Sequence, residues 1–110
     1  MQTPLVIVAI LTPPIGSIDV FREYETKAAA VIARHGGVIE RTIVEEPSEP
    51  GKPVREVHVV TFPGLEAFHR SRAGPDLASL ADMRAACIAH TELLLGRDGP
   101  DYMAVSKGAQ

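Results

Sequence analysis

The segment FREYETKAAAVIARHGG, residues 21–37, decides the fold of this chain. When it is placed on a helix, most of its apolar and aromatic side chains share one stripe. The members of this stripe are Phe21, Tyr24, Ala28, Val31, Ile32 and His35. Gly36 and Gly37 then end the helix, because the residue after a helix often has a positive φ angle, which glycine adopts without steric cost. The segment therefore predicts one amphipathic helix that stops at a defined point.

Three strands are predicted around this helix. Residues 5–11 (LVIVAIL) are continuously apolar and rich in β-branched side chains, which is typical of a strand covered on both faces. Residues 38–45 (VIERTIVE) and 54–62 (VREVHVVTF) form a predicted hairpin, because the prolines between them cannot continue a ladder. Strict alternation along the second strand places Ile39 and Arg41 on the same face of the sheet.

The second half of the chain predicts two helices and a final strand. Residues 65–72 are expected to form a short helix, and residues 75–95 a longer one. Residues 102–106 (YMAVS) are expected to form the last strand, and residues 107–110 to fray. The predicted order is β-α-β-β-α-α-β, which is the split βαβ or ferredoxin-like plan, an α+β fold with a four-stranded antiparallel sheet. The chain is expected to be a single domain over residues 1–110.

The predicted sheet carries helices on one face only. The apolar strand at residues 5–11 needs cover on its other face as well. A second copy of the chain would supply that cover, and two-fold symmetry is the commonest way to achieve it. We therefore expect a homodimer.

Composition and charge exclude several classes of function. The net charge is −3 and no run of Lys or Arg forms a stripe, so we expect no binding to nucleic acid. The longest apolar run, residues 5–11, is too short for a membrane span of about 20 residues. The absence of a signal peptide and of a second cysteine besides Cys87 predicts a cytoplasmic protein. No Cys or His pair has zinc-site spacing and no glycine-rich phosphate loop follows a strand, so we expect neither a metal nor a cofactor.

Two motifs occur in register along the chain. The first is a Phe and a Tyr about one turn apart, a Lys one turn later and a closing His-Gly-Gly; its residues are Phe21, Tyr24, Lys27, His35, Gly36 and Gly37. The second is a Phe-Pro strand end, then a small residue, a Pro, an acid, a Leu and an Arg; its residues are Phe62, Pro63, Gly74, Pro75, Asp76, Leu80 and Arg84. On these motifs residues 5–95 resemble the family called domain of unknown function thirteen-thirty, in the dimeric α/β-barrel superfamily. The resemblance implies a ferredoxin-like fold and a dimer, and it implies no reaction.

The chain departs from this family's pattern at several positions. Thr61 stands where the family usually has Glu, and Leu77 where it has Tyr. An aromatic pair near Ser71 and Arg72 is absent, and Arg41 lies one place before the family's arginine in the second strand. If those positions line a pocket in the relatives, the pocket of this chain is altered.

Arg84 is the first candidate for a binding residue. It falls on the apolar stripe of the predicted long helix, and a buried charge is costly unless it is paired. One interpretation is a structural ion pair with Glu40 or Glu56, or a side chain that extends to the helix edge. The other is an anchor for a carboxylate or phosphate, to which the guanidinium fork is suited.

Tyr24, His58 and Arg41 complete the set of candidate ligand-binding residues. Tyr24 lies on the inward stripe of its helix and can share a helix–sheet pocket with Arg84. His58 can act as an acid or base near neutral pH, or it can be a structural histidine at the dimer face. Its strand is more hydrophobic on the face of Val57 and Val59, which predicts that those valines, and not His58, face the helices.

Two hypotheses for the function follow. The first is a protein that binds a small acidic molecule in a helix–sheet pocket, or an enzyme that acts on such a molecule without a cofactor as a monooxygenase, isomerase or lyase, types of enzyme that occur among relatives in the wider superfamily. The haem-degrading type of that superfamily uses an Asn and a Trp, and this chain contains neither residue. The second is a non-catalytic dimeric module that binds a ligand or takes part in a stress response.

Overall fold

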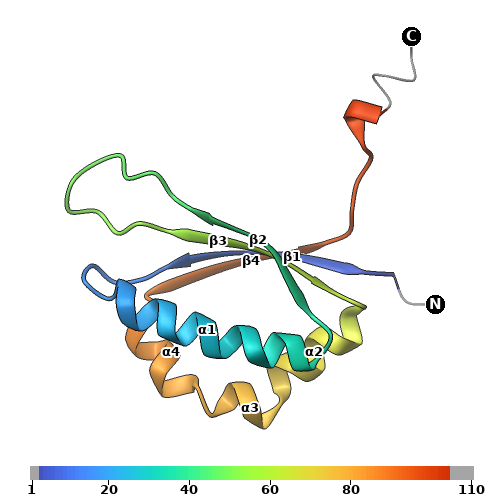
Figure 1. Cartoon of the computed structure of the whole chain (residues 1–110), viewed down its shortest axis with the longest axis horizontal. Helices are drawn as coiled ribbons and strands as arrows, with labels where there is room; N and C mark the ends of the chain where they lie inside the picture. The colour runs from blue at the N-terminus through green and yellow to red at the C-terminus, as the bar shows by residue number, and fades with distance from the viewer. Residues whose placement is uncertain (1–2, 105–110) are drawn as a thin grey trace.

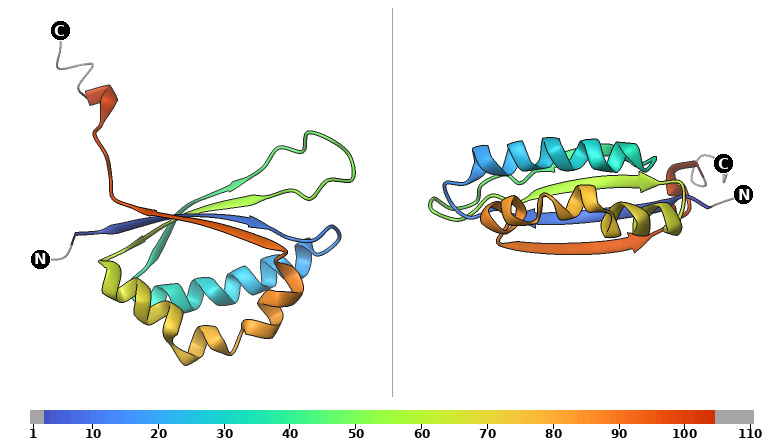
Figure 2. Two further views of the ribbon diagram at one scale, coloured as in Figure 1. Left: turned by 180° about the vertical axis from the view of Figure 1, so that it is seen from behind. Right: turned by 90° about the horizontal axis from the view of Figure 1, so that it is seen from below.

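The computed structural model describes residues 3–104 and shows one layer of helices packed on one face of a sheet (Figure 1). In chain order the elements are β1 (Leu5–Thr12), α1 (Ile18–Arg34), β2 (Val38–Val44), β3 (Glu56–Phe62), α2 (Leu65–Ala73), α3 (Pro75–Ala78), α4 (Ala81–Cys87) and β4 (His90–Gly96). Figure 2 shows α1 and the chain of short helices side by side beneath the strands. None of the helices within residues 3–104 is long and apolar enough to cross a membrane.

The sheet has the strand order β2-β3-β1-β4, and every neighbouring pair is antiparallel. Strands β1 and β3 therefore lie at its centre. This arrangement confirms the predicted α+β, ferredoxin-like fold with a four-stranded antiparallel sheet. The face of the sheet opposite the helices carries no layer within the described residues (Figure 1).

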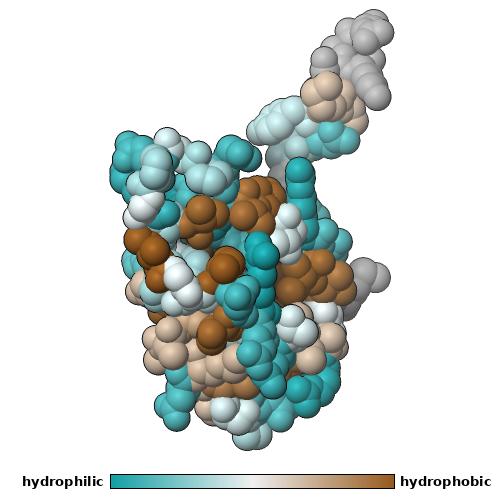
Figure 3. Space-filling model, turned by 60° about the vertical axis from the view of Figure 1, so that its left-hand side comes forward, coloured by the Kyte–Doolittle hydropathy of each residue, from teal (hydrophilic) through white to brown (hydrophobic). Residues whose placement is uncertain are grey.

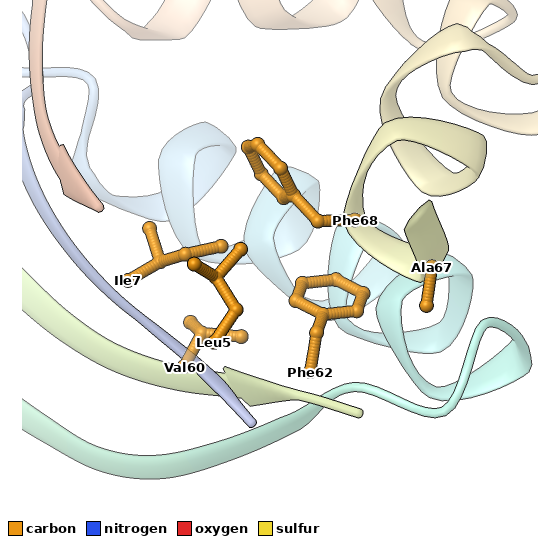
Figure 4. Packing of buried hydrophobic residues seen from close by; sticks show 6 residues of the cluster. All are labelled: Leu5, Ile7, Val60, Phe62, Ala67 and Phe68. Atoms are coloured by element: carbon orange, nitrogen blue, oxygen red, sulfur yellow. The ribbon is translucent and has the colours of Figure 1, made fainter. Parts of the chain in front are cut away.

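Two hydrophobic clusters join the helices to the sheet. The first joins β1 and β3 to α2 (Figure 4); its buried members are Leu5, Ile7, Val60, Phe62, Ala67 and Phe68. Within it the rings of Phe62 and Phe68 meet edge to face with centroids 5.7 Å apart. The second joins β1 to α1 and α4; its buried members are Leu11, Phe21, Tyr24, Ala28, Cys87 and Ile88. The predicted inward stripe of α1 is thus confirmed at Phe21, Tyr24 and Ala28.

The backbone conformation and close packing at positions 36 and 37 require glycine at both. Gly36 has a φ of 81°, in the left-handed region that favours glycine. At Gly37 a Cβ atom would lie 2.5 Å from Cγ2 of Ile32 and 2.8 Å from Cε1 of Phe62. The chain therefore turns from α1 into β2 by passing directly against the aromatic ring that ends β3.

The prediction for the last third of the chain is wrong. Residues 75–95 do not form one helix: α3 and α4 are short, Ile88 is extended, and β4 follows. The run TELLL pairs with β1 instead, which satisfies the backbone groups on that edge of β1. Periodicity alone does not distinguish a helix from a strand in so short an apolar run. This run forms a strand because β1 offers an edge with which it can pair.

The prediction of a last strand at residues 102–106 is also wrong over its described part, residues 102–104. Residues 102–104 form a helical turn, in which the backbone N–H groups of Met103 and Ala104 donate to Oδ1 of Asp101. Val105 and Ser106 lie outside the described residues, as do residues 107–110. Residues 97–104 form a C-terminal arm that leaves the sheet on the side opposite the helices (Figure 1).

A β-bulge changes the faces of β2. Ile39 pairs with Val60, whereas Arg41 pairs with Val59, with a register shift between them. Directly paired residues share a face, so Ile39 lies on the helix side and Arg41 on the opposite side. The prediction that they share a face is wrong, because the bulge interrupts strict alternation.

Candidate functional site

A pocket of about 430 Å³ lies between the helix side of the sheet and helices α1, α2, α3 and α4. Much of its wall is apolar and comes from the centre of the sheet and from α2; this part includes Ile7, Ala9, Val60, Phe62 and Phe68. Its polar part comes from four elements besides β4; its members are Tyr24 and Glu25 from α1, His58 from β3, Ser71 and Arg72 from α2, Arg84 from α4 and Thr91 from β4. The pocket thus combines an apolar wall with a few polar groups, which is the usual composition of a small-molecule site.

Arg84 reaches the pocket from α4 and is only partly exposed. Its Nη2 donates a hydrogen bond of 2.8 Å to Oγ1 of Thr91 on β4. The ion pairs among residues 3–104 do not include Arg84, so the structural ion pair with Glu40 or Glu56, one of the two interpretations of the sequence, does not form. Thr91 therefore orients the guanidinium without removing its charge.

Tyr24 lies at the same end of the pocket as Arg84 and is 4% exposed. Burial raises the pKa of its hydroxyl, and the positive charge of Arg84 partly offsets that effect. The structure thus brings together Tyr24 and Arg84, as the sequence predicts for a helix–sheet pocket.

His58 faces the helices and is 5% exposed, so the prediction from strand hydrophobicity is wrong. Its Nε2 donates a hydrogen bond of 2.7 Å to Oε1 of Glu56, and its Nδ1 lies 3.4 Å from Oε2 of Glu25. These partners allow polar side chains to occupy the buried face. Val57 and Val59 take the opposite face, where they are partly exposed.

Glu25 is the pocket residue that the sequence reasoning missed. Its side chain is 15% exposed. Burial raises the pKa of its carboxyl; His58 and Arg84 act to lower that pKa, and Glu56 adds to the rise. The signal was present, because Glu25 lies four residues after Phe21 and three before Ala28, the spacing of the inward face of α1.

Two further residues lie outside this polar group. Arg41 is exposed on the far side of the sheet and does not reach the pocket. Cys87 is fully buried in the second cluster, and burial raises the pKa of its thiol, which fits a core residue more than a nucleophile. Within residues 3–104 no cluster of His, Cys, Asp or Glu has the arrangement of a metal site.

The chain is similar in structure to several solved proteins. RPA0582, a protein of unknown function from Rhodopseudomonas palustris, superposes with a TM-score of 0.71 at 14% identity, covering 91% of this chain and 85% of that one. SnoaB, a cofactor-independent oxygenase from Streptomyces nogalater, gives 0.66 at 20% identity, covering 90% and 96%. A dimeric protein of unknown function and ferredoxin-like fold from Bacteroides fragilis gives 0.63 at 13% identity, covering 88% and 98%.

These similarities define only the fold class. At such identities they place the chain among ferredoxin-like α+β proteins, and they assign no reaction to it. No protein-family model matches the chain, and no curated protein shows significant similarity to it. The specific family that the sequence motifs resemble therefore stays a prediction.

Proposed function

We propose that the pocket binds a small acidic molecule whose carboxylate pairs with Arg84, and that the protein acts on this molecule without a cofactor. The observation that carries the proposal is a partly buried guanidinium that lines a pocket, is oriented by Thr91 and has no carboxylate partner within residues 3–104. An unneutralised charge in such a place is costly, and a ligand anion would compensate for it. The guanidinium fork also suits a carboxylate geometrically.

The apolar wall indicates the rest of the ligand. Aromatic side chains of Phe62 and Phe68 and aliphatic ones of Ile7 and Val60 line the pocket beyond its polar end. A flat aromatic body bearing one carboxylate would bury its ring against this wall and direct its charge to Arg84. We therefore propose an aromatic acid as the class of ligand.

Catalysis of the oxygenase, isomerase or lyase type is supported by the groups beside the anchor. Tyr24, Glu25 and His58 all line the pocket and can donate or accept protons. The similarity in fold to SnoaB, a cofactor-independent oxygenase, agrees with a reaction that needs no bound cofactor. This similarity is a fold-level analogy and leaves the reaction type to experiment.

We also infer that the protein is a homodimer whose subunits meet through the open face of the sheet. On this face Val8 lies between Val59 on β3 and Leu94 on β4, and Leu94 is 63% exposed. Figure 3 shows hydrophobic side chains exposed on the body of the molecule below the C-terminal arm. A contiguous apolar surface of this kind favours a protein partner, and the similar protein from Bacteroides fragilis is dimeric.

Replacing Arg84 by methionine tests the ligand proposal. We expect 2-naphthoate to bind the wild-type protein. Its affinity for Arg84→Met should be about tenfold to a hundredfold lower, since hydrogen bonds to a charged group contribute about 1.5–3 kcal/mol. Isothermal titration calorimetry measures the change. The uncharged analogue 2-naphthalenemethanol should bind both proteins equally weakly.

The matched control is Arg22→Met, the same substitution at an exposed position on α1. It should leave binding of 2-naphthoate unchanged. The melting temperature of Arg84→Met should equal or exceed that of the wild type, because the substitution removes a partly buried charge that has no carboxylate partner. Equal affinity of the wild type and Arg84→Met for 2-naphthoate would contradict the proposed anchor.

A further inference from the structure

The pocket contains a second polar group besides Arg84, formed by Glu25, His58 and Glu56. Their side chains are 15%, 7% and 9% exposed, so the group is largely buried. Glu25 and His58 line the pocket directly. Glu56 is the residue to which the His58 ring is hydrogen-bonded. The pocket therefore holds a titratable group that the anchoring of a carboxylate by Arg84 does not use.

The His58 ring connects the two carboxylates. Its Nε2 donates to Oε1 of Glu56 at 2.7 Å, which orients the ring and leaves Nδ1 facing Oε2 of Glu25 at 3.4 Å. A proton on the Glu25 carboxyl or on Nδ1 keeps this contact attractive.

An anionic ligand would change the protonation of Glu25. The charged and titratable groups that face Glu25 are His58 and Glu56 from β3, Arg84 and Cys87 from α4, and Tyr24 from α1 itself. Arg84 favours the ionised form of Glu25. A ligand carboxylate on Arg84 would neutralise that influence and add a negative charge to the pocket, and both effects favour a protonated Glu25.

We propose that Glu25 is the proton-transfer residue of the pocket, and that binding of an anionic ligand to Arg84 brings a proton from solvent onto the Glu25 carboxyl. In a later transfer the O–H bond of Glu25 breaks, the proton bonds to the ligand, and Glu25 is left as a carboxylate. His58, oriented by Glu56, is a positioning residue for this proton. The inference rests on the proposed function, because it requires an acidic ligand on Arg84.

Proton uptake during binding tests the inference. Calorimetric titration of the wild-type protein with 2-naphthoate, at one pH in buffers of different ionisation enthalpy, counts the protons taken up per ligand. We expect net proton uptake within a pH window that lies between the pKa of Glu25 in the free protein and its higher pKa in the complex. Within that window affinity should rise as pH falls, because the complex holds more protons than the free protein. Uptake should vanish below the window, where Glu25 is already protonated.

Three variants locate the proton. Glu25→Gln should bind 2-naphthoate at least as tightly as the wild type and without proton uptake, because the amide has similar shape and no charge. Glu23→Gln, the same substitution at an exposed position on α1, should keep the full uptake. His58→Gln should shift the window to higher pH, because His58 acts to lower the pKa of Glu25.

The outcomes separate this inference from the proposed function. Binding that depends on Arg84 but proceeds without proton uptake would overturn the role of Glu25 alone. Full uptake retained in Glu25→Gln would also overturn it. Failure of 2-naphthoate to bind across the whole pH range would overturn both the inference and the proposed function.

Discussion

Phe21→Ala is expected to lower the free energy of unfolding by about 3–5 kcal/mol, the usual cost of truncating a buried phenylalanine. Phe21 is 0% exposed and packs in the cluster that joins α1 to β1 and to the end of α4. Alanine would leave a cavity at the point where these elements meet, and the surrounding backbone can close it only in part. Because total stabilities are about 5–15 kcal/mol, this single change would remove a large share.

Urea unfolding followed by circular dichroism measures this effect. Wild type and variant should be compared at one protein concentration, since association links stability to concentration. The matched control is Val20→Ala on the preceding residue of α1, which is 45% exposed and should change stability little. A change of less than about 1 kcal/mol for Phe21→Ala would show that the cluster does not hold α1 on the sheet.

Val8→Asp is expected to convert the proposed dimer to a monomer. Val8 lies at the centre of the open face, with Val59 and Leu94 as its lateral neighbours. Because the interface is two-fold, the substitution places two carboxylates in it, one from each subunit. Each buried polar group that lacks a partner costs about 2 kcal/mol or more of dimerisation free energy. The dissociation constant should therefore rise about a thousandfold or more. Sedimentation velocity over a range of concentrations measures the change.

Two control variants distinguish a specific loss of the dimer from misfolding and from a nonspecific effect of the added charge. Leu94→Asp places the same charge on the edge strand at a more exposed position, where the fold tolerates it better. It should also dissociate the dimer while the circular dichroism spectrum is retained. Val20→Asp, on the helix layer, should leave the dimer intact. A wild-type protein that sediments as a monomer would contradict the inferred interface.

The sequence predicted the first two thirds of the fold well because local signals and packing agree there. The amphipathic stripe of α1, its glycine stop and the two runs that form the hairpin all specify the observed elements. The last third failed because its signal is not local. Residues 90–96 become a strand only because β1 has a free edge to pair with, and no pattern within the segment contains that information.

The candidate site was predicted in part for the same reason. Arg84 and Tyr24 were found because each is polar on an apolar stripe of its own helix, and the structure places both in one pocket. The surroundings of His58 depend on pairing across β3 and α1, so its face was assigned wrongly and Glu25 was missed. Arg41 does not reach the pocket, because the β-bulge in β2 places its side chain on the opposite face of the sheet.

The central claim is that Arg84 anchors an acidic ligand, and the NMR signal of its Nε–H group tests this most directly. In a titration of uniformly ¹⁵N-labelled protein with 2-naphthoate, we expect the Arg84 signal to shift and to saturate with the calorimetric dissociation constant. The Nε–H signal of the exposed Arg22 should stay in place. An Arg84 signal that does not move at saturating 2-naphthoate would contradict the account.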